Sequence, residues 1–146
     1  MLPITYFSHT TFASVKPGDL VYRLYNGISK PQLLIQAPNG DLRVLDLKAF
    51  TTAAVDAREP VFSLGAPEWR VNHNAISAGT GISAGDIVVT PTDTLIQIPN
   101  VMTSGMFASI SGVYQPVNIS GDDVIFTNWE VGTVVDGAFV AVATKP

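Results

Sequence analysis

Gly-Asp leads into a pair of apolar residues at three places in this chain, Gly18, Gly85 and Gly121, with Asp123 standing between the dipeptide and the pair at the third. One interpretation is a repeated ligand-binding loop in which the aspartate carboxylates contact the ligand. The alternative is turn chemistry, because glycine supplies backbone freedom and an aspartate side chain can bond its own backbone two residues on. The unequal intervals between the copies argue against a solenoid or propeller, so we expect three turns that lead into strands.

A second acidic candidate is Asp122-Asp123, which is followed by Glu130. A calcium loop alternates oxygen donors along the chain and closes on a bidentate carboxylate. Here Val124, Ile125 and Phe126 stand where ligands would be required. We therefore expect a turn that leads into a strand, with no metal ion and no cofactor.

The two histidines, His9 and His73, are the remaining residues with catalytic potential. A zinc site needs three or four ligands, and neither histidine stands at a spacing typical of one. A Ser8–His73–aspartate triad can be drawn, but the chain has no Gly-x-Ser-x-Gly elbow to present a nucleophile. The glycine-rich segment 79–85 lacks the Lys-Ser/Thr of a phosphate loop. The sequence thus predicts a protein that is not an enzyme.

Composition points to contacts between subunits. Charged residues make up 14% of the 146 residues, against about 25% in an ordinary domain, and hydrophobic residues make up 47%. Protein interfaces are depleted in charge, so we expect a subunit of a permanent homo-oligomer. The net charge of −4 and the lack of a basic stripe argue against nucleic acid. No apolar run approaches the roughly 20 residues of a membrane helix, and no secretory signal is visible, so a soluble protein is expected.

The elements expected to position these residues are strands. Val, Thr and Ile dominate, and turn signals fall every ten or so residues, which predicts an all-β antiparallel sandwich or barrel. Residues 1–16 are expected to form an extended N-terminal arm. Residues 17–146 would form a β-rich body, with a candidate division into two sub-modules near 72–85. The single short helix is expected within 46–59, where alanines and Phe50 lie at helical spacing before Pro60.

Twelve strands are predicted: 20–25, 33–37, 42–47, 61–64, 69–71, 87–90, 94–98, 106–110, 113–119, 124–127, 131–135 and 139–143. Asn26-Gly27, Asn39-Gly40 and Asp136-Gly137 are each expected to form a two-residue type I′ turn with positive φ. Proline cannot donate to a β ladder, so the prolines among these strands are expected at strand ends or edges.

Two segments are expected to contact other chains. The apolar residues of the arm alternate with hydroxyl residues, which suits strand addition to the edge of a neighbouring subunit rather than packing on the arm's own body. The hairpin 131–144 has apolar or small residues on both faces and its only charge at the turn, so we expect the core on one face and a partner on the other. The predicted interface residues are Ile4, Tyr6, Phe7, Phe12, Phe139, Val140 and Val142.

An alternative function uses the aromatic residues. A platform of stacked rings could bind sugars, which would make the chain a carbohydrate- or receptor-binding β-module of a tail appendage. Core or interface anchoring is the competing role for the same rings. The residues concerned are Tyr22, Tyr25, Trp69, Tyr114 and Trp129.

The overall character of the chain resembles that of bacteriophage virion accessory proteins of the capsid decoration, or cement, type. The resemblance rests on the arm 1–16, the cysteine-free strand-rich body and the C-terminal hairpin, whose strands carry no charge between 131 and 144. It implies a non-enzymatic virion structural protein that is made in the host cytoplasm and sits on the capsid surface. It further implies an oligomer, with a trimer favoured, that stabilises the shell by contacting the major capsid protein.

Overall fold

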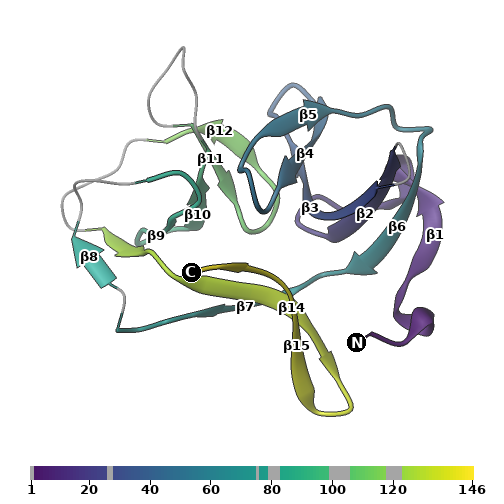
Figure 1. Cartoon of the computed structure of the whole chain (residues 1–146). Helices are drawn as coiled ribbons and strands as arrows, with labels where there is room; N and C mark the ends of the chain where they lie inside the picture. Colours follow the sequence, from purple (N-terminus) through teal and green to yellow (C-terminus); the bar gives the residue numbers. More distant parts are fainter. Residues whose placement is uncertain (1, 26–27, 75, 79–82, 99–105, 118–122) are drawn as a thin grey trace.

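The fold of the chain is all-β, as predicted. The computed structural model describes all residues except 1, 26–27, 75, 79–82, 99–105 and 118–122 (Figure 1). The described residues form strands β1 to β15 and two short 3₁₀ helices, η1 (Ile4–Tyr6) and η2 (Phe12–Ser14). The strands form three antiparallel sheets, and none of the sheets closes into a barrel. No helix among these residues has the length and apolar character needed to cross a membrane.

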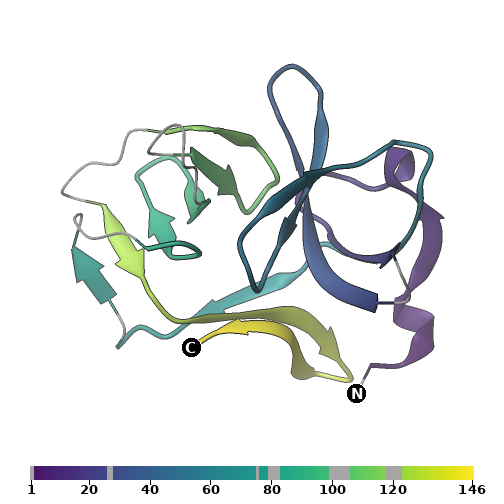
Figure 2. The same ribbon diagram turned by 45° about the horizontal axis from the view of Figure 1, so that its top comes forward.

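Two six-stranded sheets lie side by side, and a three-stranded sheet runs beneath both (Figures 1 and 2). The first sheet contains β1 (Ser8–Thr11), β6 (Pro60–Gly65), β2 (Leu20–Tyr25), β3 (Ile28–Gln36), β4 (Leu42–Asp46) and β5 (Thr52–Ala54), in that order. The second sheet contains β8 (Ile76–Ala78), β13 (Val124–Phe126), β9 (Ile87–Val89), β10 (Thr94–Gln97), β11 (Met106–Ser109) and β12 (Tyr114–Pro116). The third, here called the floor sheet, contains β7 (Glu68–Val71), β14 (Trp129–Val135) and β15 (Ala138–Lys145), with β14 in the middle.

The two six-stranded sheets have the same topology. The strands of each sheet are numbered here in chain order as one set, β1–β6 for the first sheet and β8–β13 for the second. In both sets the sixth strand lies between the first and the second, and the third, fourth and fifth strands follow in order. The strand that follows each set, β7 or β14, then enters the floor sheet, where these two strands pair antiparallel. The described fold therefore consists of one seven-stranded unit built twice, followed by the single additional strand β15.

Equivalent turns open the second strand of each unit. Gly18 and Gly85 have φ of +93° and +80°, and the carboxylates of Asp19 and Asp86 accept the backbone N–H groups of Lys16 (3.4 Å) and Ser83 (2.8 Å). The aspartates thus bond the residue three positions back, rather than two positions on as expected. Turn chemistry is confirmed at these two Gly-Asp sites, and the third, Gly121-Asp122, lies outside the described residues.

The β7–β14 pair has two-fold symmetry, because the two strands run antiparallel and carry similar residues at equivalent positions. Trp69 pairs with Val131, and Trp129 pairs with Val71, so a Trp-x-Val triplet on each strand faces its own copy. Arg70 and Glu130 face each other at the centre. A pseudo-two-fold axis therefore passes through the floor sheet between these central residues and relates the two units.

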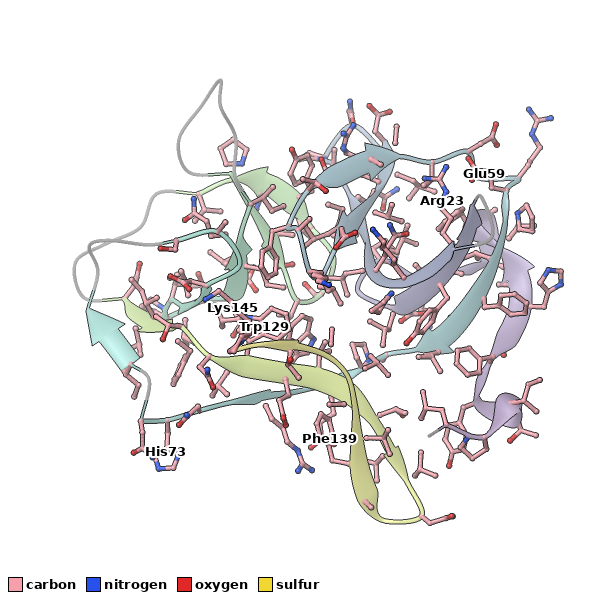
Figure 3. All side chains as sticks on the ribbon, viewed as in Figure 1. Arg23, Glu59, His73, Trp129, Phe139 and Lys145 are labelled. Carbon is pink, nitrogen blue, oxygen red and sulfur yellow. The ribbon has the colours of Figure 1, made fainter. Side chains whose placement is uncertain are left out.

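A single large core joins the three sheets. Its buried residues come from both units and from the floor sheet: Leu20, Leu33, Ile35, Leu45, Leu47, Phe50, Ile87, Ile96, Ile98, Ala108, Trp129 and Val131. Trp129 is 1% exposed and donates its indole N–H to the carbonyl of Gly85 over 2.8 Å. Figure 3 shows Trp129 between the floor sheet and the sheets above it.

The helix predicted within 46–59 does not form, which corrects that prediction. The carboxylate of Asp46 accepts the N–H groups of Lys48 and Ala49, and the Phe50 N–H bonds the Asp46 carbonyl over 2.9 Å. This single turn stops at Phe50, whose φ of +58° is left-handed. Thr52–Ala54 continues as β5, because pairing with β4 satisfies its backbone. This strand and β8, which lies in the segment expected to be a connector, were not predicted.

Two of the three predicted hairpin turns lie within the described residues. Asp136 and Gly137 have φ of +50° and +80° and join β14 to β15 as the expected two-residue turn. Gly40 has the expected positive φ of +94°, but its loop contains three residues, because Ala37 bonds across it to Asp41. Proline at 38 suits a type I turn and disfavours the left-handed geometry that type I′ requires. Asn26-Gly27 lies outside the described residues.

The expectation that the arm packs on a neighbour rather than on its own body is wrong for residues 8–15. Strand β1 pairs with β6 along Ser8–Thr11, at the edge of the first sheet. Phe12 is fully buried and Val15 is 8% exposed, in a second core cluster on the face of this sheet opposite the main core. Burying the large ring of Phe12 in the protein's own core stabilises the fold, whereas a free arm would leave the ring in water. This accounts for the difference.

Candidate functional site

The β14–β15 hairpin projects from the body at one end of the floor sheet (Figures 1 and 3). Near its base, Val131 is fully buried, and Val142 and Ala143 both pack against the main core. Simple alternation predicted that Val142 and Ala143 would face opposite ways. A β-bulge between Val131 and Gly132 shifts the register and brings both of them to the core.

The bulge depends on Gly132. A Cβ placed on this residue would lie 1.9 Å from the carbonyl oxygen of Val140, closer than any side chain can approach a backbone atom. The absence of a side chain therefore lets β15 cross close to β14 at this point. The crossing sets the direction in which the rest of the hairpin leaves the body.

The solvent side of the floor sheet, here called the outer face, carries both charged and apolar side chains. Glu68 and Arg70 come from β7, Val134 from β14 and Phe139 from β15. Val134 is 42% exposed, and the Arg70 guanidinium lies 4.2 Å from the centre of the Phe139 ring (Figure 3). A cation over a ring stabilises a half-buried aromatic residue such as Phe139 and fixes its orientation. The outer face is thus an ordered surface that no other described part of the chain covers.

The predicted arm residues divide into exposed and buried groups. Ile4 is 85% exposed and Tyr6 is 37% exposed, both in η1. Phe7 packs edge-on against Tyr22 of β2, with ring centres 5.5 Å apart, and burial raises the pKa of the Tyr22 hydroxyl above its usual value. Phe12 is buried and presents no surface to a partner.

Figures 1 and 2 both place the start of the chain beside the hairpin. The N-terminal segment that contains η1 therefore lies at the same end of the molecule as the β14–β15 hairpin. Exposed apolar side chains therefore lie near both termini at this end: Ile4 and Tyr6 from η1 and Val134 from the hairpin, with Phe139 half-buried beside them. Ile4, Tyr6 and Phe139 belong to the predicted interface. Val140 lies on the same hairpin and is half-buried.

The residues considered for catalysis are not assembled into a site. His9 is exposed in β1 and contacts the ring of Phe62 at 5.0 Å, and His73 is exposed beyond the end of β7 (Figure 3). Among the described residues, no three His, Cys, Asp or Glu side chains lie close enough to hold a metal ion. Asp123 is buried at the start of β13, whereas Asp122 lies outside the described residues.

The aromatic residues do not gather into a platform on the described surface. Trp129 is buried, and its ring meets those of Trp69 (5.2 Å) and Phe50 (6.0 Å) edge-on within the core. Tyr22 lies against Phe7 near β1, away from both tryptophans in the sheet order. The tryptophans therefore act as core anchors.

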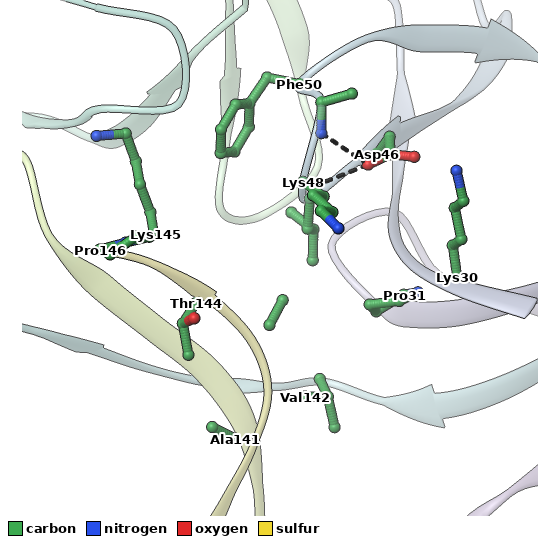
Figure 4. Close-up of a pocket in the computed structure, with 13 residues that line it drawn as sticks. Lys30, Pro31, Asp46, Lys48, Phe50, Ala141, Val142, Thr144, Lys145 and Pro146 are labelled. Carbon is green, nitrogen blue, oxygen red and sulfur yellow. Dashed lines mark hydrogen bonds between the residues drawn. The ribbon is translucent and has the colours of Figure 1, made fainter.

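A groove of about 840 Å³ lies between β15 and the first sheet (Figure 4). Its lining residues come from three segments that are distant in sequence: Lys30 and Pro31; Asp46, Leu47, Lys48, Ala49 and Phe50; and Ala141, Val142, Ala143, Thr144, Lys145 and Pro146. The volume lies within the usual range for small-molecule sites. Most of the lining is apolar or small, so shape and burial would supply most of its affinity.

The charges around the groove have different roles. Lys145 is held in the structure, because its ammonium group lies 3.0 Å from the buried carboxylate of Asp86 and bonds the carbonyl of Thr127. The ammonium groups of Lys30 and Lys48 are exposed and have no carboxylate partner among the described side chains. These two lysines make the rim of the groove basic in an otherwise acidic protein.

Sequence reasoning missed this groove because its walls come from three separate segments. Lys30 and Lys48 are two of only four lysines in the chain, and that scarcity was the one available signal. A comparison of the chain with protein-family models, with curated proteins and with solved structures finds no match.

Proposed function

We propose that this chain is a non-enzymatic structural protein that acts by binding other protein subunits. The observation that carries the proposal is the exposed apolar surface at the end of the floor sheet. Ile4 and Tyr6 from the N-terminal segment and Val134 from the hairpin are exposed there, beside the half-buried Phe139. An ordered apolar surface of this kind, on a protein with few charges, is typical of a docking surface.

The finer form of the proposal is a capsid decoration subunit. In that role the exposed apolar surface would lie against the major capsid protein of a bacteriophage shell, and the chain would form a homo-oligomer on the capsid surface. Low surface charge, an apolar hairpin and an N-terminal segment whose first turn extends from the body all support it. The sugar-binding alternative gains no support from the buried tryptophans.

The test compares two valine substitutions of matched exposure. Val134→Lys places a charge on the exposed apolar surface, whereas Val124→Lys places one on β13 of the second sheet, where the valine is 39% exposed. Both variants should melt within a few degrees of the parent, because both side chains are exposed and a lysine at either position can extend into solvent. We expect Val134→Lys to lose binding to capsids that lack the protein and Val124→Lys to retain it.

Particle composition provides the second arm of the test. Mass spectrometry of purified virions should find the chain in a copy number close to that of the major capsid protein. Absence of the chain from virions would refute the decoration role. Equal capsid binding by the Val134→Lys and Val124→Lys variants would show that the exposed apolar surface is not the docking surface.

A further inference from the structure

The floor sheet has a strand outside β14 but none at the pseudo-symmetric position outside β7 among the described residues. The pseudo-two-fold axis exchanges β7 and β14, and β14 carries β15 on its far side. The equivalent side of β7 has no strand among the described residues. Strand edges of this kind present unpaired N–H and C=O groups that favour addition of another strand.

The direction of the backbone groups on β7 follows from one hydrogen bond. The Asn72 N–H bonds the Asn128 carbonyl over 3.0 Å, which extends the β7–β14 ladder by one pair. Antiparallel ladders alternate between bonded and non-bonded pairs, so Arg70 and Glu68 also bond toward β14. The N–H and C=O groups of Trp69 and Val71 therefore point away from β14, toward the open edge.

The side chains of β7 suit a second copy of the same strand. Glu68 and Arg70 are both exposed on the outer face and already pair with each other over 3.2 Å. In an antiparallel pair centred on Trp69, each Glu68 lies opposite the Arg70 of the other copy. Shifting the centre to Arg70 would place two arginines opposite each other, and like charges directly opposite are destabilising. Charge thus favours the register centred on Trp69 over the one centred on Arg70.

The same register satisfies the backbone. Trp69 of each copy would exchange two hydrogen bonds with Trp69 of the other, and each Val71 N–H would meet the carbonyl of Pro67. Pro67 has no N–H of its own, which limits the ladder to this short contact. Two tryptophans would then become cross-strand neighbours, and aromatic pairs of this kind stabilise sheets.

We infer that two copies of this chain associate through β7, in the register that places Glu68 opposite Arg70, to form a continuous six-stranded floor sheet. This contact is isologous and closes on itself, so it generates a dimer. The inference deepens the proposed structural role, because it identifies one partner as a second copy. It differs from the trimer that the resemblance to decoration proteins implies.

The experiment uses charge reversal on the full chain, with mass measured by light scattering after size exclusion over a range of concentrations. The parent should rise from 15.5 kDa toward twice that mass as concentration increases. Glu68→Arg alone, or Arg70→Glu alone, should remain at the monomer mass, because each variant places like charges opposite each other. Mixing the two variants restores both opposite-charge pairs and should restore the dimer.

Two controls keep the result specific. Asp136→Asn removes a charge at the hairpin turn, away from β7, in a conformation that asparagine also adopts, and it should leave the dimer intact. Thermal melting of each monomeric variant shows that the fold is retained. A parent that stays monomeric, a trimer, or a dimer unaffected by Glu68→Arg would overturn the β7 contact. Capsid binding by a monomeric parent would overturn it while leaving the proposed function intact.

Discussion

Removing the ammonium group of Lys145 should cost this protein a large part of its stability. In Lys145→Met the carboxylate of Asp86, whose side chain is 2% exposed, loses a partner at 3.0 Å, and the carbonyl of Thr127 loses its donor. Breaking a buried ion pair by deleting one member costs about 3–5 kcal/mol. The Lys145 side chain is 18% exposed, so some water reaches the pair and the lower value of about 3 kcal/mol is expected.

Urea denaturation measures this loss directly. With a slope of about 2 kcal/mol per molar urea, the midpoint should fall by about 1.5 M. Lys48→Met is the matched control, because Lys48 is exposed beside the same groove, and its effect should stay within about 0.5 kcal/mol. A double-mutant cycle with Asp86→Asn should show strong coupling. A Lys145→Met midpoint equal to that of the parent, or additive single effects, would refute the buried pair.

Three other predictions concern packing, turns and titration. Gly132→Ala should destabilise the fold by about 3 kcal/mol in urea titrations, since its Cβ would meet the Val140 carbonyl, while Gly137→Ala, with open space around it, should cost about 1 kcal/mol. Phe12→Ala should cost about 3–5 kcal/mol, and a loss below 1 kcal/mol would mean that the arm is not part of the core. Burial raises the pKa of the Tyr22 hydroxyl in the folded protein above its unfolded value near 10.0. The stability that Tyr22 contributes is therefore complete below pH 10.0 and is lost as the pH rises through the folded pKa. The difference in tyrosinate absorbance between the parent and Tyr22→Phe, followed against pH, measures this shift.

Most of the strands were predictable because alternation and turn residues are local signals, whereas β1, β5 and β8 were not predicted. Leu20–Tyr25 was predicted with its observed bounds, and the Asp136-Gly137 turn follows from the conformations that these residues favour. The helix prediction failed at Phe50, because spacing of alanines does not reveal that a neighbouring aspartate will hold a single turn. Local patterns also cannot show that an apolar arm residue such as Phe12 is buried by its own body.

The duplication was visible in the sequence but required a different comparison. The hexapeptide at 34–39, Leu-Ile-Gln-Ala-Pro-Asn, returns at 95–100 as Leu-Ile-Gln-Ile-Pro-Asn. Trp69-Arg70-Val71 likewise returns as Trp129-Glu130-Val131. Aligning the chain with itself would have joined these copies to the Gly-Asp turns. The groove and the outer face could not be found this way, because each depends on how distant segments cross in three dimensions.

The shared core has a consequence for how the chain can be divided. Each half contributes one strand to the β7–β14 pair and part of the residues of the main core. Separating the halves would therefore expose core residues of both to water. A backbone cut after Asn74, in the exposed stretch that follows β7, should give two fragments that are poorly structured alone. Mixed together, they should recover one native assembly, with Trp69 and Trp129 in contact across the break. By this criterion the two halves of the duplicated chain form one cooperative unit of folding.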